Sequence, residues 1–217
     1  MLRGQRLVAS DGYEVMLFPL EYLYMSQDEG GDYSHAGTLA MDFLGWGSGG
    51  RILTCPYYAP CSCRCIASTE SANRIWQSLN KVHLADGSLD YVTWVVAHDN
   101  TPPGIGTVLN QGDLMGHTGT AGFVTGDHVH LNIAKGVYAN WERVPPNNNW
   151  QLVNSIHIYN ACYVNDTVIV QGYGHNWITY NVPPTPPTPP PTMNKASFPW
   201  VLYGRKFRDR YSRIVSV

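Results

Sequence analysis

The sequence has 217 residues, of which 44% are hydrophobic and 14% are charged, and this balance excludes a globally disordered chain. Its formal net charge of −2 gives no indication of nucleic acid as a partner. Fourteen Tyr and seven Trp, with 21 Gly and 15 Pro, favour a mainly β protein. We expect an antiparallel β-sheet core with one short helix and long loops.

The N-terminal part of the chain predicts two short strands around a loop. Residues 13–25 are typical of a strand that Pro19 interrupts. Residues 26–38 are polar and rich in glycine, which suits a loop. A second short strand begins within residues 39–43.

Three of the five cysteines alternate within residues 51–68, where we expect further strands. Side chains two positions apart on a strand share one face, so Cys61, Cys63 and Cys65 are interpreted as thiols that fill a buried face. Such a cluster could also bind a metal or form a disulfide. However, the spacing differs from the usual zinc pattern, and an odd number of thiols cannot pair completely.

Residues 69–84 contain the only convincing helical pattern of the chain. Ile75, Leu79 and Val82 follow the spacing i, i+4, i+7, which predicts the single helix here. The sequence Ala-Asp-Gly-Ser at residues 85–88 then predicts a hairpin turn.

Strands resume at residues 91–97, 107–109 and 128–134, and histidines stand at two of them. The first is rich in β-branched and aromatic residues and leads to His98. The third opens on His128-Val129-His130, and a strand aims the two imidazoles of such a triplet to the same face. Imidazole and carboxylate are both good zinc ligands, and a catalytic zinc takes three protein ligands while one position stays open.

The order of these residues resembles the M23 family of zinc metallopeptidases, the LytM/lysostaphin-like enzymes that cut peptide bonds in bacterial peptidoglycan. The matching pattern is a histidine and an aspartate (His35, Asp42), a histidine at a strand end (His98), a glycine-rich segment, and the His128–His130 triplet. Six residues separate His35 from Asp42, more than is common in the family. The stretch from Ser34 to Phe43 is similar to a variant found in enzymes of phages that infect Gram-positive hosts.

The resemblance implies a zinc site and a catalytic pair. His35, Asp42 and His130 are the implied Zn²⁺ ligands, with Asp32 as the alternative carboxylate. His98 and His128 are the implied catalytic residues, which would handle protons and stabilise the oxyanion. Among the other histidines, His117 is a candidate partner of the site, whereas His83, His157 and His175 are interpreted as surface or structural residues.

The implied function is a zinc-dependent endopeptidase that hydrolyses stem or cross-bridge peptides of peptidoglycan. A phage would use it for wall lysis as an endolysin, or for genome entry as a tail-associated lysin. The alternatives are a catalytically degenerate M23 domain that serves as a binding component of a phage tail, and a tail protein whose main role is assembly.

Composition divides the chain into three parts. Residues 1–182 are predicted as the peptidase domain, with its core at about 30–135 and an extension at 136–182. Residues 183–192 are a Pro-rich linker. Residues 193–217 form a basic, aromatic tail that could contact other virion proteins or the chain itself.

Nothing in the sequence predicts a membrane span or a signal peptide. No segment approaches the roughly 18–20 apolar residues that cross a bilayer. Within residues 1–25, acidic residues and Pro19 interrupt the apolar stretch that a secretory signal requires. We therefore expect the protein in the phage virion, or in the host cytoplasm before its release to the cell wall.

Overall fold

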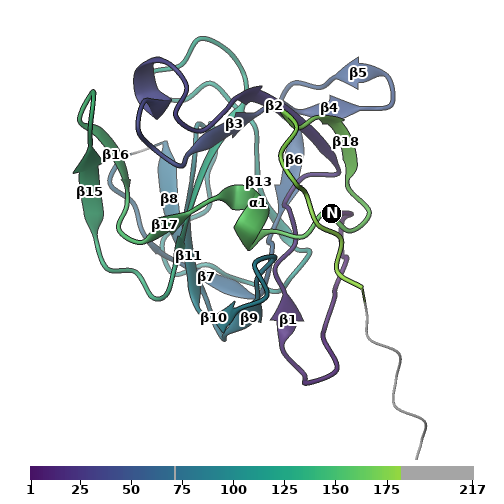
Figure 1. Cartoon of the computed structure of the whole chain (residues 1–217). Helices are drawn as coiled ribbons and strands as arrows, with labels where there is room; N and C mark the ends of the chain where they lie inside the picture. Colours follow the sequence, from purple (N-terminus) through teal and green to yellow (C-terminus); the bar gives the residue numbers. More distant parts are fainter. Residues whose placement is uncertain (71, 182–217) are drawn as a thin grey trace, which may run out of the picture. The chain divides into compact units, whose positions relative to one another are not determined.

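A computed structural model describes residues 1–70 and 72–181 (Figure 1). The predicted linker at 183–192 and the predicted tail at 193–217 lie outside these residues. The part up to residue 182 forms one compact unit. No helix in the described ranges is long and apolar enough to cross a membrane.

A nine-stranded sheet forms the centre of the described unit, which confirms the prediction of a mainly β protein. All its pairings are antiparallel except the one between β18 and β2. In spatial order the strands are β12 (Val108–Leu109), β7 (Cys63–Ala67), β8 (Asn73–Ser78), β11 (Val92–Ala97), β14 (Val129–Lys135), β3 (Met41–Phe43), β2 (Tyr22–Gln27) and β18 (Val168–Gln171), with β17 (Ser155–Ile156) paired to β14.

Smaller sheets and two short helices surround the main sheet (Figure 1). The helices are a 3-10 turn, η1 (Tyr33–His35), and α1 (Ile158–Ala161). The small sheets are β1 (Glu14–Val15) with β9 (Val82–His83) and β10 (Leu89–Asp90); β6 (Pro56–Tyr58) with β13 (Leu114–His117); β15 (Trp141–Val144) with β16 (Asn149–Leu152); and β4 (Trp46–Gly47) with β5 (Gly50–Arg51).

Side chains are buried on both faces of the main sheet. Alternate residues of β11 belong to two hydrophobic clusters: Trp94 and Val96 to the larger one, and Val95 to a smaller one with Ile75 and Ala134. This explains why β11 is an almost unbroken run of apolar residues, because a strand covered on both faces needs no polar side.

The predicted helix at 69–84 is wrong. The segment instead contains β8 and β9, which lie in two different sheets. Strand β8 is covered on both faces, so buried residues such as Ile75 and Trp76 follow one another and imitate helical spacing. Leu79, the middle position of the assumed helical stripe, is exposed.

Within the described residues, the α-helix lies in the predicted extension instead. Apolar and polar residues alternate over 155–164 as they would in a strand, but only β17 is extended there and α1 follows it. The turn at 85–88 is confirmed: it joins β9 to β10, and Gly87 has the positive φ of 84° that favours glycine.

The cysteine prediction holds. Cys61, Cys63 and Cys65 are fully buried while Arg64 between them is exposed, and all five cysteines are free thiols. Among the described residues, none of them belongs to a group that could hold a metal ion.

Candidate metal and catalytic site

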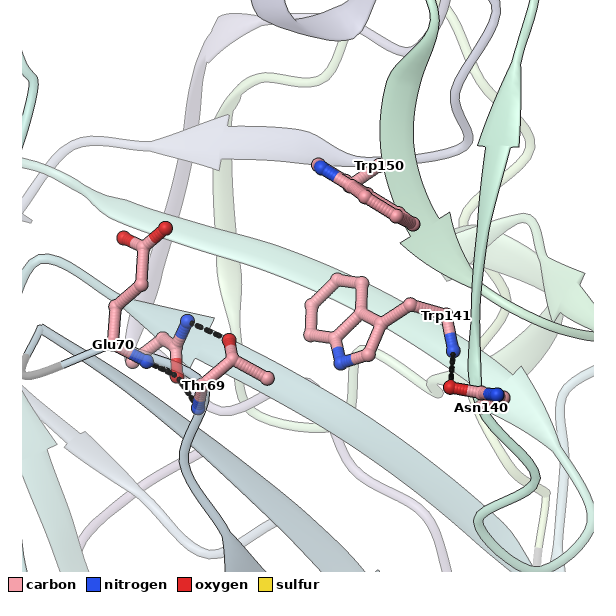
Figure 2. A pocket seen from close by; sticks show the side chains of 6 residues that line it. Thr69, Glu70, Asn140, Trp141 and Trp150 are labelled. Atoms are coloured by element: carbon pink, nitrogen blue, oxygen red, sulfur yellow. Dashed lines mark hydrogen bonds between the residues drawn. The ribbon is translucent and has the colours of Figure 1, made fainter.

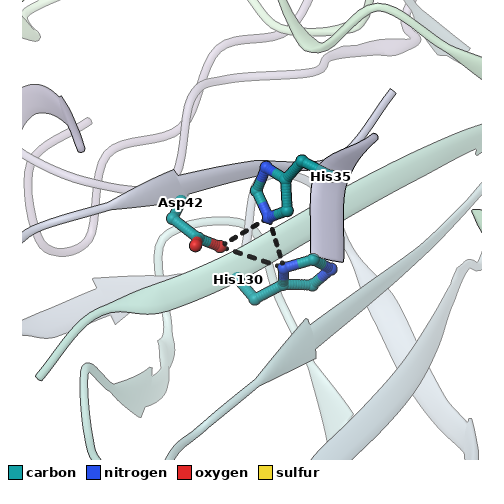
Figure 3. A group of neighbouring side chains, drawn as sticks. All are labelled: His35, Asp42 and His130. Carbon is teal, nitrogen blue, oxygen red and sulfur yellow. Dashed lines mark hydrogen bonds and ion pairs between the residues drawn. The ribbon is translucent and has the colours of Figure 1, made fainter. Parts of the chain in front are cut away.

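Three side chains from three elements converge at one end of the main sheet (Figure 3). His35 comes from η1, Asp42 from β3 and His130 from β14. The register pairs Asp42 directly with His130, which brings these two side chains together. The Oδ1 atom of Asp42 lies 2.9 Å from Nδ1 of His130 and 3.2 Å from Nε2 of His35. The two imidazole nitrogens are 3.2 Å apart.

The arrangement fits a small metal ion. Two imidazoles and a carboxylate are suitable zinc ligands, and a tetrahedral zinc with ligands at about 2.0–2.1 Å would separate neighbouring ligand atoms by about 3.3 Å. The three separations of 2.9–3.2 Å are close to that value. His35 is also in the right tautomer, because its Nδ1 donates to the carbonyl oxygen of Asp28 at 3.0 Å. Its Nε2 lone pair is therefore directed toward the other two ligands.

Asp42 stays ionised in this environment. Burial by itself would raise the pKa of its carboxyl group, but hydrogen bonds with His130 and His35 outweigh burial. They hold the pKa well below its ordinary value, so the site keeps an anionic ligand across the physiological pH range.

His98 and His128 lie beside the three converging residues. Their ring centroids are 4.6 Å apart, and Nε2 of His128 is 3.4 Å from Oδ2 of Asp42. In each ring Nδ1 contacts a backbone carbonyl, of Ala121 at 2.9 Å and of Gly126 at 2.8 Å. Because a carbonyl can only accept, Nδ1 is the donor and Nε2 is left to exchange protons.

The backbone fixes both histidines. Gly119 pairs with His128 through two hydrogen bonds, and a Cβ atom on Gly119 would lie 2.2 Å from the carbonyl oxygen of His98. His98 itself has a positive φ of 81°, a strained conformation for a residue with a side chain. Burial lowers the pKa of His98 to about 4, although its hydrogen bond to Ala121 acts in the opposite direction. Its imidazole is neutral at pH 7.

The remaining sequence candidates are not part of the His35–Asp42–His130 group. Asp32 precedes η1 and is outside the His35–Asp42–His130 group. His117 lies on β13, where its backbone N–H donates to Asp99 at 2.9 Å. His157 pairs with Glu29 and His175 with Asp28, both at 2.8 Å. His83 pairs with Asp11 at 2.9 Å.

Several residues that support the site are absent from the sequence-based list. Asp28 fixes the tautomer of His35 through its backbone, which no side-chain pattern reveals. Asp127 is buried beside His128 and accepts from Thr118 at 2.6 Å and from the Thr54 N–H at 3.1 Å. Asp99, next to His98, is buried in the same way. The acidic residue next in sequence to His98 and to His128 was the available signal.

Comparisons with known proteins find sequence relatives, one of which is described here. No protein-family model matches the chain. Morphogenesis protein 1 of Bacillus phage B103 is 40% identical over 173 residues, which cover 78% of this chain and 46% of that protein. The chain therefore spans about half the length of this relative.

Solved structures are more distant. A zinc-containing peptidase from Vibrio cholerae matches with a TM-score of 0.41 and 14% identity, over 60% of this chain and 43% of its own. The catalytic domain of the peptidase lysostaphin from Staphylococcus simulans matches with a TM-score of 0.38 and 15% identity, over 54% and 80%.

Proposed function

We propose that this protein is a zinc-dependent endopeptidase that hydrolyses peptide bonds in bacterial peptidoglycan. The observation that carries the proposal is the convergence of His35, Asp42 and His130 next to a pair of histidines with fixed tautomers. Lewis-acid activation of the scissile carbonyl and acidification of the attacking water are the chemistry that zinc supplies in such a site.

His98 and His128 would move the protons of the reaction. Each donates through Nδ1, which leaves Nε2 for proton transfer. His98 is neutral at pH 7 and is therefore able to accept a proton from the attacking water. His128, whose Nε2 lies near Asp42, is placed to hold a proton for the developing oxyanion or for the leaving amine.

The proposal is tested with purified peptidoglycan and the full chain. Hydrolysis of peptide bonds releases new amino groups, whereas cleavage of the glycan strand releases new reducing ends. We expect amino groups only, with loss of activity in a chelator and recovery when zinc is added. Activity that survives both chelation and His130→Ala would contradict a metallopeptidase.

The biological setting proposed is a phage particle. The relative in Bacillus phage B103 is named a morphogenesis protein, which favours a role in or on the virion, as a tail-associated lysin, over a free endolysin. Mass spectrometry of purified virions separates these two roles, because an endolysin is absent from the particle.

The same name favours a second candidate, a catalytically inactive component of the phage tail. It predicts that the protein is present in virions but releases no amino groups from peptidoglycan. Substitution of His128 would then leave wall degradation by the particle unchanged.

A further inference from the structure

A cavity lies on the face of the sheet to which Asp42 and His130 belong, because the cross-strand register puts its lining residue Asn73 on that face. Its volume is about 510 Å³, and it lies between the segment that joins β7 to β8 and the β15–β16 hairpin (Figure 2). Trp141 and Trp150 form one wall and Thr69 and Glu70 the other, with Asn73 and Asn140 completing the lining.

The register of the sheet places this cavity close to the proposed scissile bond. Asn73 pairs with Ala97 on β11, and Ala97 pairs with His130 on β14. Strands lie about 4.8 Å apart, so Asn73 is about 10 Å from His130 across the sheet. The segment before β8 also contacts the catalytic pair, because the N–H of His98 donates to the carbonyl of Ala72 at 2.8 Å.

The hairpin that carries the two tryptophans is attached to the loop that carries His35. The side-chain amide of Asn149 donates to the carbonyl of Tyr33 at 2.6 Å and to that of Ala36 at 3.1 Å. A Cβ atom on Gly37 would lie 1.8 Å from the carbonyl oxygen of Pro145 in the same hairpin. The tryptophan wall and the metal ligand His35 are therefore held in a fixed relation.

The main sheet offers no free strand edge to a peptide in this cavity. Strands β8 and β11 are interior strands, each paired on both sides, so neither offers a free edge. The side chains that line the cavity are therefore the groups we consider for recognition.

The side chains suit a sugar ring. Flat indole faces carry negative potential and attract the C–H groups on the apolar face of a pyranose. Trp150 is 52% exposed, and Arg143 already covers one face of its ring at 4.2 Å. Figure 2 shows the carboxylate of Glu70 extending from the opposite wall, where it can accept hydrogen bonds from hydroxyl or N-acetyl N–H groups.

We propose that this cavity binds an N-acetylhexosamine ring of the glycan strand whose peptide is cut at the neighbouring site. This inference rests on the proposed function. The separation of about 10 Å corresponds to about three residues of extended chain, which suits a stem peptide that links the sugar to the scissile bond.

The test measures binding of a peptide-free ligand, an N-acetylglucosamine tetramer, to the full chain by isothermal titration calorimetry. We expect saturable binding that Trp150→Ala weakens by about tenfold or more. Glu70→Gln, which preserves size, should weaken it severalfold and serves as the second variant should Trp150→Ala fold poorly. Tyr13→Ala removes another partly exposed aromatic, at a separate pocket beside β1, and should bind normally.

The outcomes separate this inference from the proposed function. A wild-type chain that releases amino groups from peptidoglycan but does not bind the tetramer overturns the sugar site alone. Equal binding by wild type, Trp150→Ala and Glu70→Gln also overturns it. If the chain binds the tetramer through Trp150 but releases no amino groups from peptidoglycan, the sugar site stands and the proposed peptidase function is wrong.

Discussion

At the scale of single residues, contacts with the backbone hold the proposed ligand His35 and the neighbouring pair, His98 and His128. The tautomer of His35 is set by Asp28, and His98 and His128 each donate to a backbone carbonyl. Such outer contacts orient ligands and tune their basicity. The site is therefore organised in the protein itself, and single substitutions should separate metal binding from catalysis.

The first prediction concerns the metal. The purified protein should contain one zinc ion per chain, and His130→Ala or Asp42→Ala should lose it, since each removes one of three ligands. Elemental analysis after dialysis measures the content. Asp32→Ala is the matched control and should retain zinc. Zinc at full stoichiometry in His130→Ala would show that the ligands are assigned wrongly.

The second prediction concerns the catalytic pair. His128→Ala should lower the rate by roughly 10²–10⁴-fold while zinc content stays near normal. For His98 the informative variant is His98→Asn, because asparagine tolerates the positive φ of 81° better than alanine does. It should show the same loss. If either variant hydrolysed its substrate at a near-normal rate, the histidine that it replaces would have no role in proton transfer.

At the scale of elements, local patterns predicted some strands and missed others for identifiable reasons. The strand that leads to His98 and the one that carries His130, with His128 directly before it, were predictable from their composition. Asp42 could be placed on a strand but not opposite His130, because pairing between distant segments leaves no local signal. Strand β8 was missed because its burial on both faces hides the alternation. The role of the β15–β16 hairpin depends on contacts such as Asn149 to Tyr33, which no local pattern indicates.

The third prediction tests the junction between the hairpin and the His35 loop. Gly37→Ala should destabilise the protein by about 3 kcal/mol or more, because a methyl group there collides with the Pro145 carbonyl in addition to the strain of positive φ. Gly12→Ala is the control. Gly12 has a similar φ of +89° but no atom near its Cβ position, so strain alone should cost about 1–2 kcal/mol. Denaturant unfolding measures the free energy of unfolding of both variants. Equal losses would mean that the hairpin can move away from Gly37 at no energetic cost.

The fourth prediction concerns the buried thiols. Burial raises the pKa of all five cysteines, and the thiolate is the reactive form. A disulfide reagent should therefore modify none of them within minutes in the native protein and all five after unfolding.

The same burial makes the stability depend on pH. Thiols of the unfolded chain ionise near pH 9.0, while the buried thiols of the folded protein stay protonated. Because the unfolded chain then binds fewer protons, the free energy of unfolding should fall above that pH. A stability that rises between pH 8 and 10 would contradict this.

At the scale of the whole molecule, charge is distributed unevenly. Residues 193–217 carry six basic side chains and one acidic side chain, a net of +5, which leaves −7 for the rest of the chain. All residues of the proposed metal and sugar sites precede residue 151 and lie in the unit that ends at residue 182. We thus assign the proposed catalysis to residues before 151, and long-range attraction to anionic partners to the basic residues 193–217.

The last prediction follows from that division. A chain that ends at Val182 should still cut a soluble peptide, because it keeps every proposed ligand and catalytic residue. It should bind anionic cell walls, or enter virions, less well than the full chain. Binding of the full chain to walls should weaken with added salt, since the Debye length is about 8 Å at physiological ionic strength and shorter above it. Co-sedimentation with walls at several salt concentrations, beside a soluble-peptide assay, measures the two properties separately. If the shortened chain unfolds or loses soluble-peptide cleavage, residues 183–217 belong to the catalytic unit, and the attraction that we assign to their charge is instead a requirement of folding.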